Sequence, residues 1–272
     1  MIKVFVDSGS SIKQNEKELY NVDIIPLKIL LNDKEYLDGI DLTMDIFYDA
    51  LISKKQFPKT SLPDSSLVEE KVMKCINEGD DVIILTISSG ISGTYNAMNL
   101  LFQDKPKVHI IDSQTAVGGV KILVKEINKY RNEGIDVVIG KINTLIPRIR
   151  VYAVPETLAY LHKGGRLSAA GYTAATLFRI KPVIELRKTV SVSNKTLGLK
   201  KAMNEIIAKL ESCDTNYPIV PSYTYKTDNL NELILRTDDK YKAIMIDFDN
   251  LDPAIAAHWG PNAFGYIFVE KE

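Results

Sequence analysis

The N-terminal half of the chain alternates short apolar runs with helical patterns, and this order constrains the fold more than any other feature. Strand-like runs rich in β-branched residues occur at 2–6, 23–31, 81–87, 107–111 and 150–154. Apolar residues with helical spacing occur at 43–53, 63–77, 94 onward, 117–130 and 136–146. Because strands that alternate with helices form parallel βαβ units, we expect an α/β fold with an N-terminal, mostly parallel sheet flanked by helices.

The pattern changes after Thr157 and predicts a second, mixed α/β domain. Helices are expected at 158–163, 171–178 and 196–211, and between two later strands. Strands are expected at 182–193, 219–224, 243–248 and 265–269. We place the boundary at residue 157, so that domain 1–157 carries the candidate site and domain 158–272 covers it.

Composition excludes several classes of function. The 272 residues are 45% hydrophobic and 25% charged, which suits a globular core that can hold a ligand cavity. The net charge of −1 gives no basic surface for nucleic acid. No apolar run approaches the roughly 20 residues that span a bilayer, and the first residues do not resemble a signal peptide. Cys75 and Cys213 lack disulfide-motif or metal-site spacing, which is typical of reduced thiols in a cytoplasmic protein.

The segment from Ser88 to Tyr95, with the sequence SSGISGTY, is the strongest candidate site. It follows a predicted buried strand and begins a helix, and ligands of open α/β sheets lie at such strand ends. No Lys follows Gly93, so it is not a P-loop, and Thr94 occupies the last position of the hydrolase pattern G-x-S-x-G. A carboxylate cradle needs only hydroxyl and backbone donors, and Ser92, Gly93 and Thr94 provide them.

Three other segments carry candidate residues, each with an ordinary structural explanation. Thr60 and Ser61 could donate hydrogen bonds to a ligand, or could cap the helix that follows. Arg166, after Gly164-Gly165, could bind an anion or lie on the surface after a helix end. His258 precedes a Gly-Pro turn and could point into a cleft or bond to backbone. Since the histidines at 109, 162 and 258 are scattered, we expect no metal site.

Taken together, these segments resemble the DegV family, the fatty-acid-binding proteins of bacteria, along the whole chain. The matching motifs are Asp7-Ser8, Lys59-Thr60-Ser61-Leu62-Pro63, Ser88 to Tyr95, Asp112-Ser113, Tyr160-Leu161 with Gly164-Gly165-Arg166, Ile180-Lys181-Pro182, and His258 with Gly260-Pro261. Departures are Asn262, where kinase-associated members often carry Gly, and Arg187-Lys188-Thr189, which lacks an expected hairpin Gly. The basic residues that such members use to dock a partner are only loosely matched by Lys195, Lys200 and Lys201.

The resemblance implies a binding protein without catalytic residues or a cofactor. The ligand would be one long-chain fatty acid such as palmitate, stearate or oleate, with its tail in a buried tunnel. Thr60 and Ser92 would be the principal carboxylate donors, with Ser61, Gly93, Thr94, Arg166 and His258 in the surrounding network. Some members present the lipid to an ATP-dependent fatty acid kinase subunit, which forms an acyl-phosphate.

Two other functions remain open on the residues alone. The order Ser92, then Asp247 or Asp249, then His258 mimics the catalytic triad of a serine esterase. The turn from Ser88 to Thr94 could instead bind a phosphate or nucleotide through the N-terminus of its helix.

Overall fold

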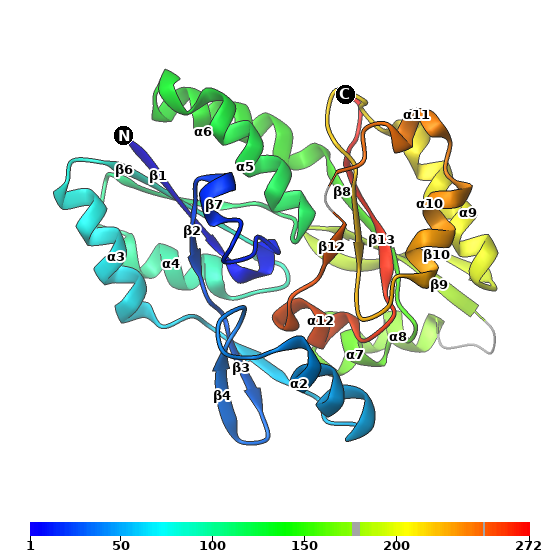
Figure 1. The fold of residues 1–272 in the computed structure, drawn as a ribbon. Coiled ribbons are helices and arrows are strands. Elements are labelled where there is room, and N and C mark those ends of the chain that lie inside the picture. Colours follow the sequence, from blue (N-terminus) through cyan, green and yellow to red (C-terminus); the bar gives the residue numbers. More distant parts are fainter. Residues whose placement is uncertain (176–179, 247) are drawn as a thin grey trace.

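The computed structural model describes residues 1–175, 180–246 and 248–272, and it confirms the predicted α/β fold (Figure 1). The N-terminal sheet has the order β2 (Asp23–Ile25), β1 (Ile2–Asp7), β6 (Asp81–Thr86) and β7 (Val108–Asp112). All three pairings are parallel, so the carboxyl ends of these strands lie at one edge of the sheet.

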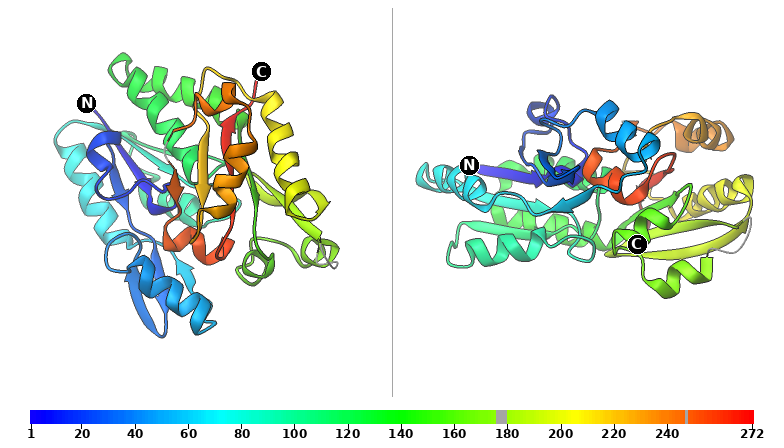
Figure 2. Two further views of the ribbon diagram at one scale, coloured as in Figure 1. Left: turned by 45° about the vertical axis from the view of Figure 1, so that its right-hand side comes forward. Right: turned by 90° about the horizontal axis from the view of Figure 1, so that it is seen from below.

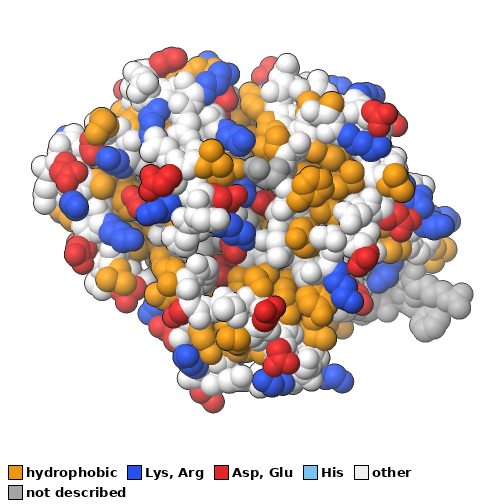
Figure 3. All heavy atoms as spheres, viewed as in Figure 1, with side chains coloured by type: hydrophobic (Ala, Val, Ile, Leu, Met, Phe, Trp, Pro, Cys, Tyr) orange, Lys and Arg blue, Asp and Glu red, His pale blue; other side chains and the backbone are white. Residues whose placement is uncertain are grey.

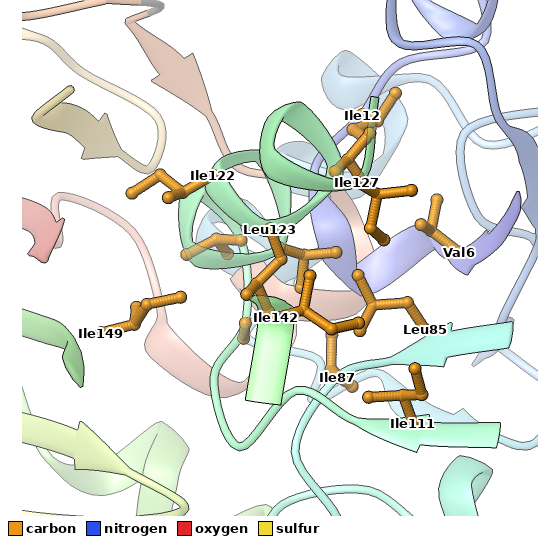
Figure 4. Close-up of a cluster of buried hydrophobic side chains, with 14 of the residues drawn as sticks. Val6, Ile12, Leu85, Ile87, Ile111, Ile122, Leu123, Ile127, Ile142 and Ile149 are labelled. Atoms are coloured by element: carbon orange, nitrogen blue, oxygen red, sulfur yellow. The ribbon is translucent and has the colours of Figure 1, made fainter. Parts of the chain in front are cut away.

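Helices cover both faces of this sheet because its strands alternate their apolar side chains. Phe5 and Ile84 pack with α3 (Ser65–Asn77) and α4 (Thr94–Phe102) on one face. Val6 and Leu85 pack with α5 (Gly118–Tyr130) and α6 (Ile135–Leu145) on the other. Figure 4 shows this second cluster, where isoleucines of α5 and α6 meet the strands. The helices predicted at 63–77, 117–130 and 136–146 are therefore present.

A second, six-stranded sheet has the order β10 (Thr189–Leu197), β9 (Ile180–Arg187), β8 (Ile149–Val154), β13 (Phe264–Val269), β11 (Val220–Tyr223) and β12 (Asp249–Asn250). Its pairings are antiparallel except for β11 with β12. Helix α5 packs against both sheets, since one cluster joins its apolar residues to Val151 and Ile267. On the opposite face lie α9 (Leu199–Lys209), α10 (Asp228–Arg236) and α11 (Asp239–Lys242). Strand β8 precedes residue 157 but pairs in this sheet, and the predicted domain boundary stays a prediction.

A small third sheet was not predicted, and it carries two candidate site residues, Thr60 and Ser61. Its order is β4 (Lys34–Leu37), β3 (Lys28–Leu31) and β5 (Lys59–Ser61). The run 23–31 divides into two strands around Pro26, which has no N–H to continue a ladder. Asn32 and Asp33 both have positive φ and form the two-residue hairpin turn between β3 and β4. Beside this sheet lie α2 (Met44–Tyr48), capped by Thr43, and the π-helical turn η2 (Asp49–Ser53).

The remaining helices are short, and two predictions here need comment. They are α1 (Lys17–Tyr20), α7 (Ala159–Lys163), α8 (Ala169–Ala175), α12 (Pro253–Trp259) and the 3-10 turns η1 (Ser8–Ser10), η3 (Arg131–Glu133), η4 (Ile146–Arg148) and η5 (Leu210–Ser212). The strand predicted at 243–248 is wrong, because of its described residues, 243–246 and 248, only Met245 pairs, in an isolated bridge, and the paired strand begins at Asp249. The end of the helix predicted at 171–178 lies outside the described residues.

Figure 2 shows α12 between the N-terminal hairpin region and the second sheet. One cluster confirms this position, since Ala254, Ala256 and Ala257 of α12 pack with Ile29 and Phe47. On the face shown in Figure 3, side chains of both charge signs are interspersed. Within the described ranges, no helix is long and apolar enough to cross a membrane.

Candidate functional site

A cavity of about 260 Å³, here called the head chamber, lies beyond the carboxyl end of β6, where the N-terminal sheet meets the second sheet and α12. Its polar lining includes Thr60, Ser61, Ser92, Gly93, Arg166 and His258. Its apolar lining includes Ile87, Ile91, Leu186, Ile255 and Trp259. The structure therefore gathers six of the seven predicted site residues around one amphipathic space. The seventh, Thr94, is buried behind the chamber and contacts Ser92.

Thr60 and His258 reach the chamber from elements that lie far apart in the sequence. Thr60 lies on β5, where it pairs with Ile29, and not on the helix cap that its sequence also allowed. The cap of α3 is Asp64, whose side chain accepts from the N–H groups of Ser66 and Leu67. His258 lies in the last turn of α12, and its Nε2 is 2.8 Å from Thr60 Oγ1.

Ser92 is held by the first turn of α4. Its Oγ accepts a hydrogen bond from the N–H of Thr94 at 3.2 Å and lies 2.9 Å from Thr94 Oγ1. If the Thr94 hydroxyl donates to Ser92, the proton of Ser92 can point into the chamber. Gly93 is exposed and is the N-cap residue of the same helix. Because glycine has no side chain, it makes no capping hydrogen bond.

Arg166 brings a positive charge to the chamber from the turn after α7. Its Nε donates to the carbonyl of Ile91 at 2.9 Å, and its Nη1 donates to the carbonyl of Gly164 at 2.5 Å. Burial lowers the pKa of the guanidinium, which nevertheless remains charged at neutral pH. Among the residues that the structure describes, no carboxylate forms an ion pair with Arg166.

His258 is neutral in this environment. Burial, and then the charge of Arg166, lower its pKa from 6.5 to about 4. A neutral imidazole has one N–H, and with that proton on Nε2 it donates to Thr60 and leaves the Thr60 proton for a ligand. His258 Nδ1 has no hydrogen-bond partner, and it packs so closely on Gly164 that a Cβ there would lie 2.2 Å away.

Two aspartates at strand ends fix the loop that carries Ser92, and sequence reasoning gave neither a role. Asp7, at the end of β1, accepts from the N–H of Ile87 at 2.9 Å. Its burial raises its pKa to about 7. Asp112, at the end of β7, accepts from the N–H of Ser89 at 3.0 Å and from its hydroxyl at 2.5 Å. The sequence carried a signal for both aspartates, because each ends a strand. These two strands, β1 and β7, are the neighbours of β6 in the sheet.

The second sheet holds the same loop from the opposite side. The Ser88 hydroxyl donates to the carbonyl of Lys188 at 2.5 Å, and the Lys188 N–H donates to the carbonyl of Gln114. A Cβ at Gly90 would lie 2.2 Å from the Lys188 carbonyl oxygen, so this contact requires glycine. The turn between β9 and β10 is thus docked on the Ser92 loop.

The chamber does not have the geometry of a serine esterase. His258 bonds to Thr60, and Ser92 bonds to Thr94, so among the described residues no hydrogen bond joins the Ser92 hydroxyl to the imidazole that an esterase would need as its base. Asp249 pairs with Lys121, and Asp247 lies outside the described residues. No group of three or more His, Cys, Asp or Glu side chains in the described part of the chain could hold a metal ion.

Fold and site define an α/β protein with an amphipathic chamber between two sheets. The family model described as uncharacterised protein, DegV family, matches residues 1–271, and the chain belongs to the DegV family. A DegV domain-containing protein of Clostridium acetobutylicum is 29% identical over 283 residues, which cover 99% of each chain.

Two solved structures are similar over the whole chain. A fatty-acid-binding DegV family protein from Thermus thermophilus is 26% identical with a TM-score of 0.86, and 99% of each chain is covered. The fatty acid kinase B3 protein of Streptococcus pneumoniae, loaded with linoleic acid, has a TM-score of 0.82 and covers 100% of each chain. Its identity of 20% shows a shared fold alone.

Proposed function

We propose that this protein binds one long-chain fatty acid, with the carboxylate in the head chamber and the tail between the two sheets. The observation that carries the proposal is one cavity that joins the hydroxyls of Thr60, Ser61 and Ser92, and a guanidinium without a carboxylate partner among the described residues, to apolar walls. The similar Thermus thermophilus protein is described as binding fatty acid, which supports the same ligand class here.

The polar end of the chamber suits a carboxylate. Ser92 Oγ accepts from the N–H of Thr94, and Thr60 Oγ1 accepts from His258 when the imidazole proton is on Nε2, so that each hydroxyl can turn its own proton to the ligand. A buried carboxylate without partners would be strongly disfavoured, and Arg166 supplies the compensating charge. Because His258 is neutral, it orients Thr60 and does not add a second positive charge. Ser61, Gly93 and Thr94 complete the surroundings of these donors.

The apolar end supplies the affinity. Burial of a methylene stabilises by about 0.8 kcal/mol, so a tail of roughly 14 methylenes contributes on the order of 11 kcal/mol before association costs. Those costs are several kcal/mol. Leu186, Ile255 and Trp259 line the way from the carboxylate donors toward the second sheet. The tail therefore provides the binding energy, and the head group fixes the orientation. No cofactor is needed for this function.

A second part of the proposal is presentation of the bound lipid to an ATP-dependent kinase subunit that forms an acyl-phosphate. The chamber residues hold the carboxylate, which is already ionised and needs no base, and the turn at Ser88–Thr94 has no P-loop lysine for ATP. A separate partner would have to bring both ATP and the catalytic groups. Incubation of the loaded protein with such a kinase subunit and ATP should yield acyl-phosphate, and with ATP alone it should not.

Native mass spectrometry of freshly purified protein tests the ligand class. We expect a co-purified mass that matches a fatty acid and disappears after solvent extraction. Palmitate or oleate added to the extracted protein should then raise its thermal unfolding midpoint. A midpoint that rises with ATP and stays constant with both acids would instead support a nucleotide-binding protein. Reaction of Ser92 with a labelled fluorophosphonate would support an esterase.

A further inference from the structure

The head chamber is too small for the whole of a long-chain fatty acid. It measures about 260 Å³. A cavity of about 150 Å³ holds one benzene, which has six carbons, so the head chamber holds roughly ten carbons. Palmitate is longer by about six carbons and therefore needs about 150 Å³ more, beyond the chamber as it stands.

The space nearest to the apolar end of the head chamber lies against the second sheet. A distal chamber of about 30 Å³ is lined there by Ala153, Ser222 and Gly265. These three residues lie side by side on β8, β11 and β13. A row of small residues across neighbouring strands leaves a shallow groove in the sheet. The distal chamber is therefore a groove that widens if the side chains opposite the sheet move away.

Two side chains separate the chambers. Trp259 and Leu186 line both cavities, so they form the partition between them. Leu186 is a strand residue that is 2% exposed and pairs with Val151, which fixes it in the core. Trp259 is the last residue of α12 and is partly exposed, and its ring packs against one cluster around α5 and another beside α7. Trp259 is thus the part of the partition that can move.

The backbone around Trp259 is fixed, so the movable part is its ring. On one side, His258 Nε2 lies 2.8 Å from Thr60 Oγ1. On the other side, the N–H of Gly260 caps α12, and a Cβ at Gly260 would lie 2.3 Å from the ring of Tyr160. A tail that enters the distal chamber does so by turning the indole about its side-chain bonds toward solvent, while α12 stays in place.

We propose that Trp259 sets the chain-length selectivity of this protein: acids of up to about ten carbons bind with the indole in place, and longer acids displace it to enter the distal chamber. The inference rests on the proposed fatty-acid function. Each methylene buried in the head chamber strengthens binding by about fourfold. Beyond the partition the total gain is smaller, because the tail has to break the contacts of the indole with both clusters.

Fluorescence tests the displacement directly, because Trp259 is the only tryptophan of the chain. In the delipidated full-length protein, decanoic acid should bind without moving the emission maximum. Palmitate should move it to longer wavelength, since the displaced indole is more exposed to water. An unchanged maximum with palmitate that calorimetry shows to be bound would overturn the proposal, because the tail would then leave by another route. An equal change with both acids would also overturn it.

A series of saturated acids from decanoic to octadecanoic acid tests the selectivity. For the wild type, we expect affinity to rise by about fourfold per methylene up to the partition and to rise less beyond it. Trp259→Ala joins the two chambers, so the full rise should continue. The ratio of palmitate affinity to decanoic acid affinity should then be about tenfold larger than in the wild type.

A second variant keeps the proposal testable if alanine destabilises the fold. Trp259→Phe keeps a smaller ring in the partition, and its ratio should lie between those of the wild type and Trp259→Ala. The same dependence on chain length in the wild type and in the folded variants would overturn the role of Trp259. Failure of every acid to bind the wild type would instead overturn the proposed function, which separates the two results.

Discussion

Two regions of this molecule bury positive charge, and they differ in what balances it. In the first, Lys121 is 1% exposed and its Nζ lies 2.5 Å from Asp249, while Lys13 lies 2.5 Å from Asp252. In the head chamber, Arg166 meets only backbone carbonyls among its described hydrogen-bond partners. A buried cation with its own carboxylate holds the fold together. A half-buried cation that lacks one, such as Arg166, is suited to bind a carboxylate from outside.

The largest expected effect belongs to the paired region. Lys121→Met leaves Asp249 buried without its partner, and we expect a loss of about 3–5 kcal/mol in the free energy of unfolding. Urea denaturation measures this loss. The double variant Lys121→Met, Asp249→Asn should recover part of it, because it removes the uncompensated charge. Palmitate affinity of the folded fraction should stay close to wild type, and a large fall would show that the two regions are not separate.

Protonation of His258 should lower the free energy of unfolding by about 3 kcal/mol at low pH, and this distinguishes His258 from the ion-paired groups. The pKa of His258 is lowered to about 4 from 6.5, so between these values the unfolded chain binds the proton and the folded chain does not. Its contribution to stability is therefore full above pH 6.5 and is lost as pH falls toward 4. Asp7 has the opposite sign: its pKa of about 7 means that its contribution is lost as pH rises from about 4 to 7.

The comparison of wild type with His258→Asn isolates this contribution, because Asp7 is common to both proteins. The stability difference between them should change by about 3 kcal/mol between pH 7 and pH 4. A bound fatty acid should reduce the change, since its carboxylate favours the imidazolium form. A difference that stays constant over this range, with and without ligand, would contradict the placement of His258 beside Arg166.

Replacement of Arg166 should change the affinity for palmitate more than the free energy of unfolding. Arg166→Met should weaken palmitate binding by about 10–100-fold, the range expected for a charge-assisted hydrogen bond of about 1.5–3 kcal/mol. Stability should change by only about 1 kcal/mol, because the variant leaves no carboxylate unpaired. Arg187→Met is the matched control, since Arg187 is exposed on the second sheet. Equal affinities of the two variants would remove Arg166 from the site.

The smallest effect concerns a cation at the surface. Lys188 is exposed and has φ of +65°, a conformation that glycine adopts without strain. Lys188→Gly should raise the unfolding free energy by about 0.5–1 kcal/mol while its backbone still accepts from Ser88. Lys188→Ala removes the ammonium and keeps the strain, so it should give no such gain. Thermal unfolding of the two variants therefore separates charge from backbone conformation.

Much of the fold followed from local patterns, because strand and helix periods and caps are local properties. The helical spacing at 63–77 and the β-branched runs indicated α3 and its neighbouring strands. The π-turn at Asp49 and the short strand β12 depend on tertiary contacts, and no periodicity signals them. Pro26 and Asn32-Asp33 did carry signals for a break and a hairpin, which the single run 23–31 obscured.

The candidate site was predicted as a set of residues but not as a network. The motif around Ser92 pointed to hydroxyl donors, and the structure places Thr60 in the same chamber. The Thr60–His258 bond joins residues 198 positions apart, which a single sequence cannot reveal. The assignment of Thr60, Ser92 and His258 to a ligand stays a prediction.

Titration of palmitate into wild type and into the double variant Thr60→Ala, Ser92→Ala tests the central claim most directly. Loss of two hydrogen bonds to the carboxylate, at about 1.5–3 kcal/mol each, should weaken binding by about 100-fold or more, while the apolar walls and the unfolding midpoint stay nearly unchanged. Equal affinity of the two proteins would contradict the account, since the carboxylate would then be held elsewhere or not held at all.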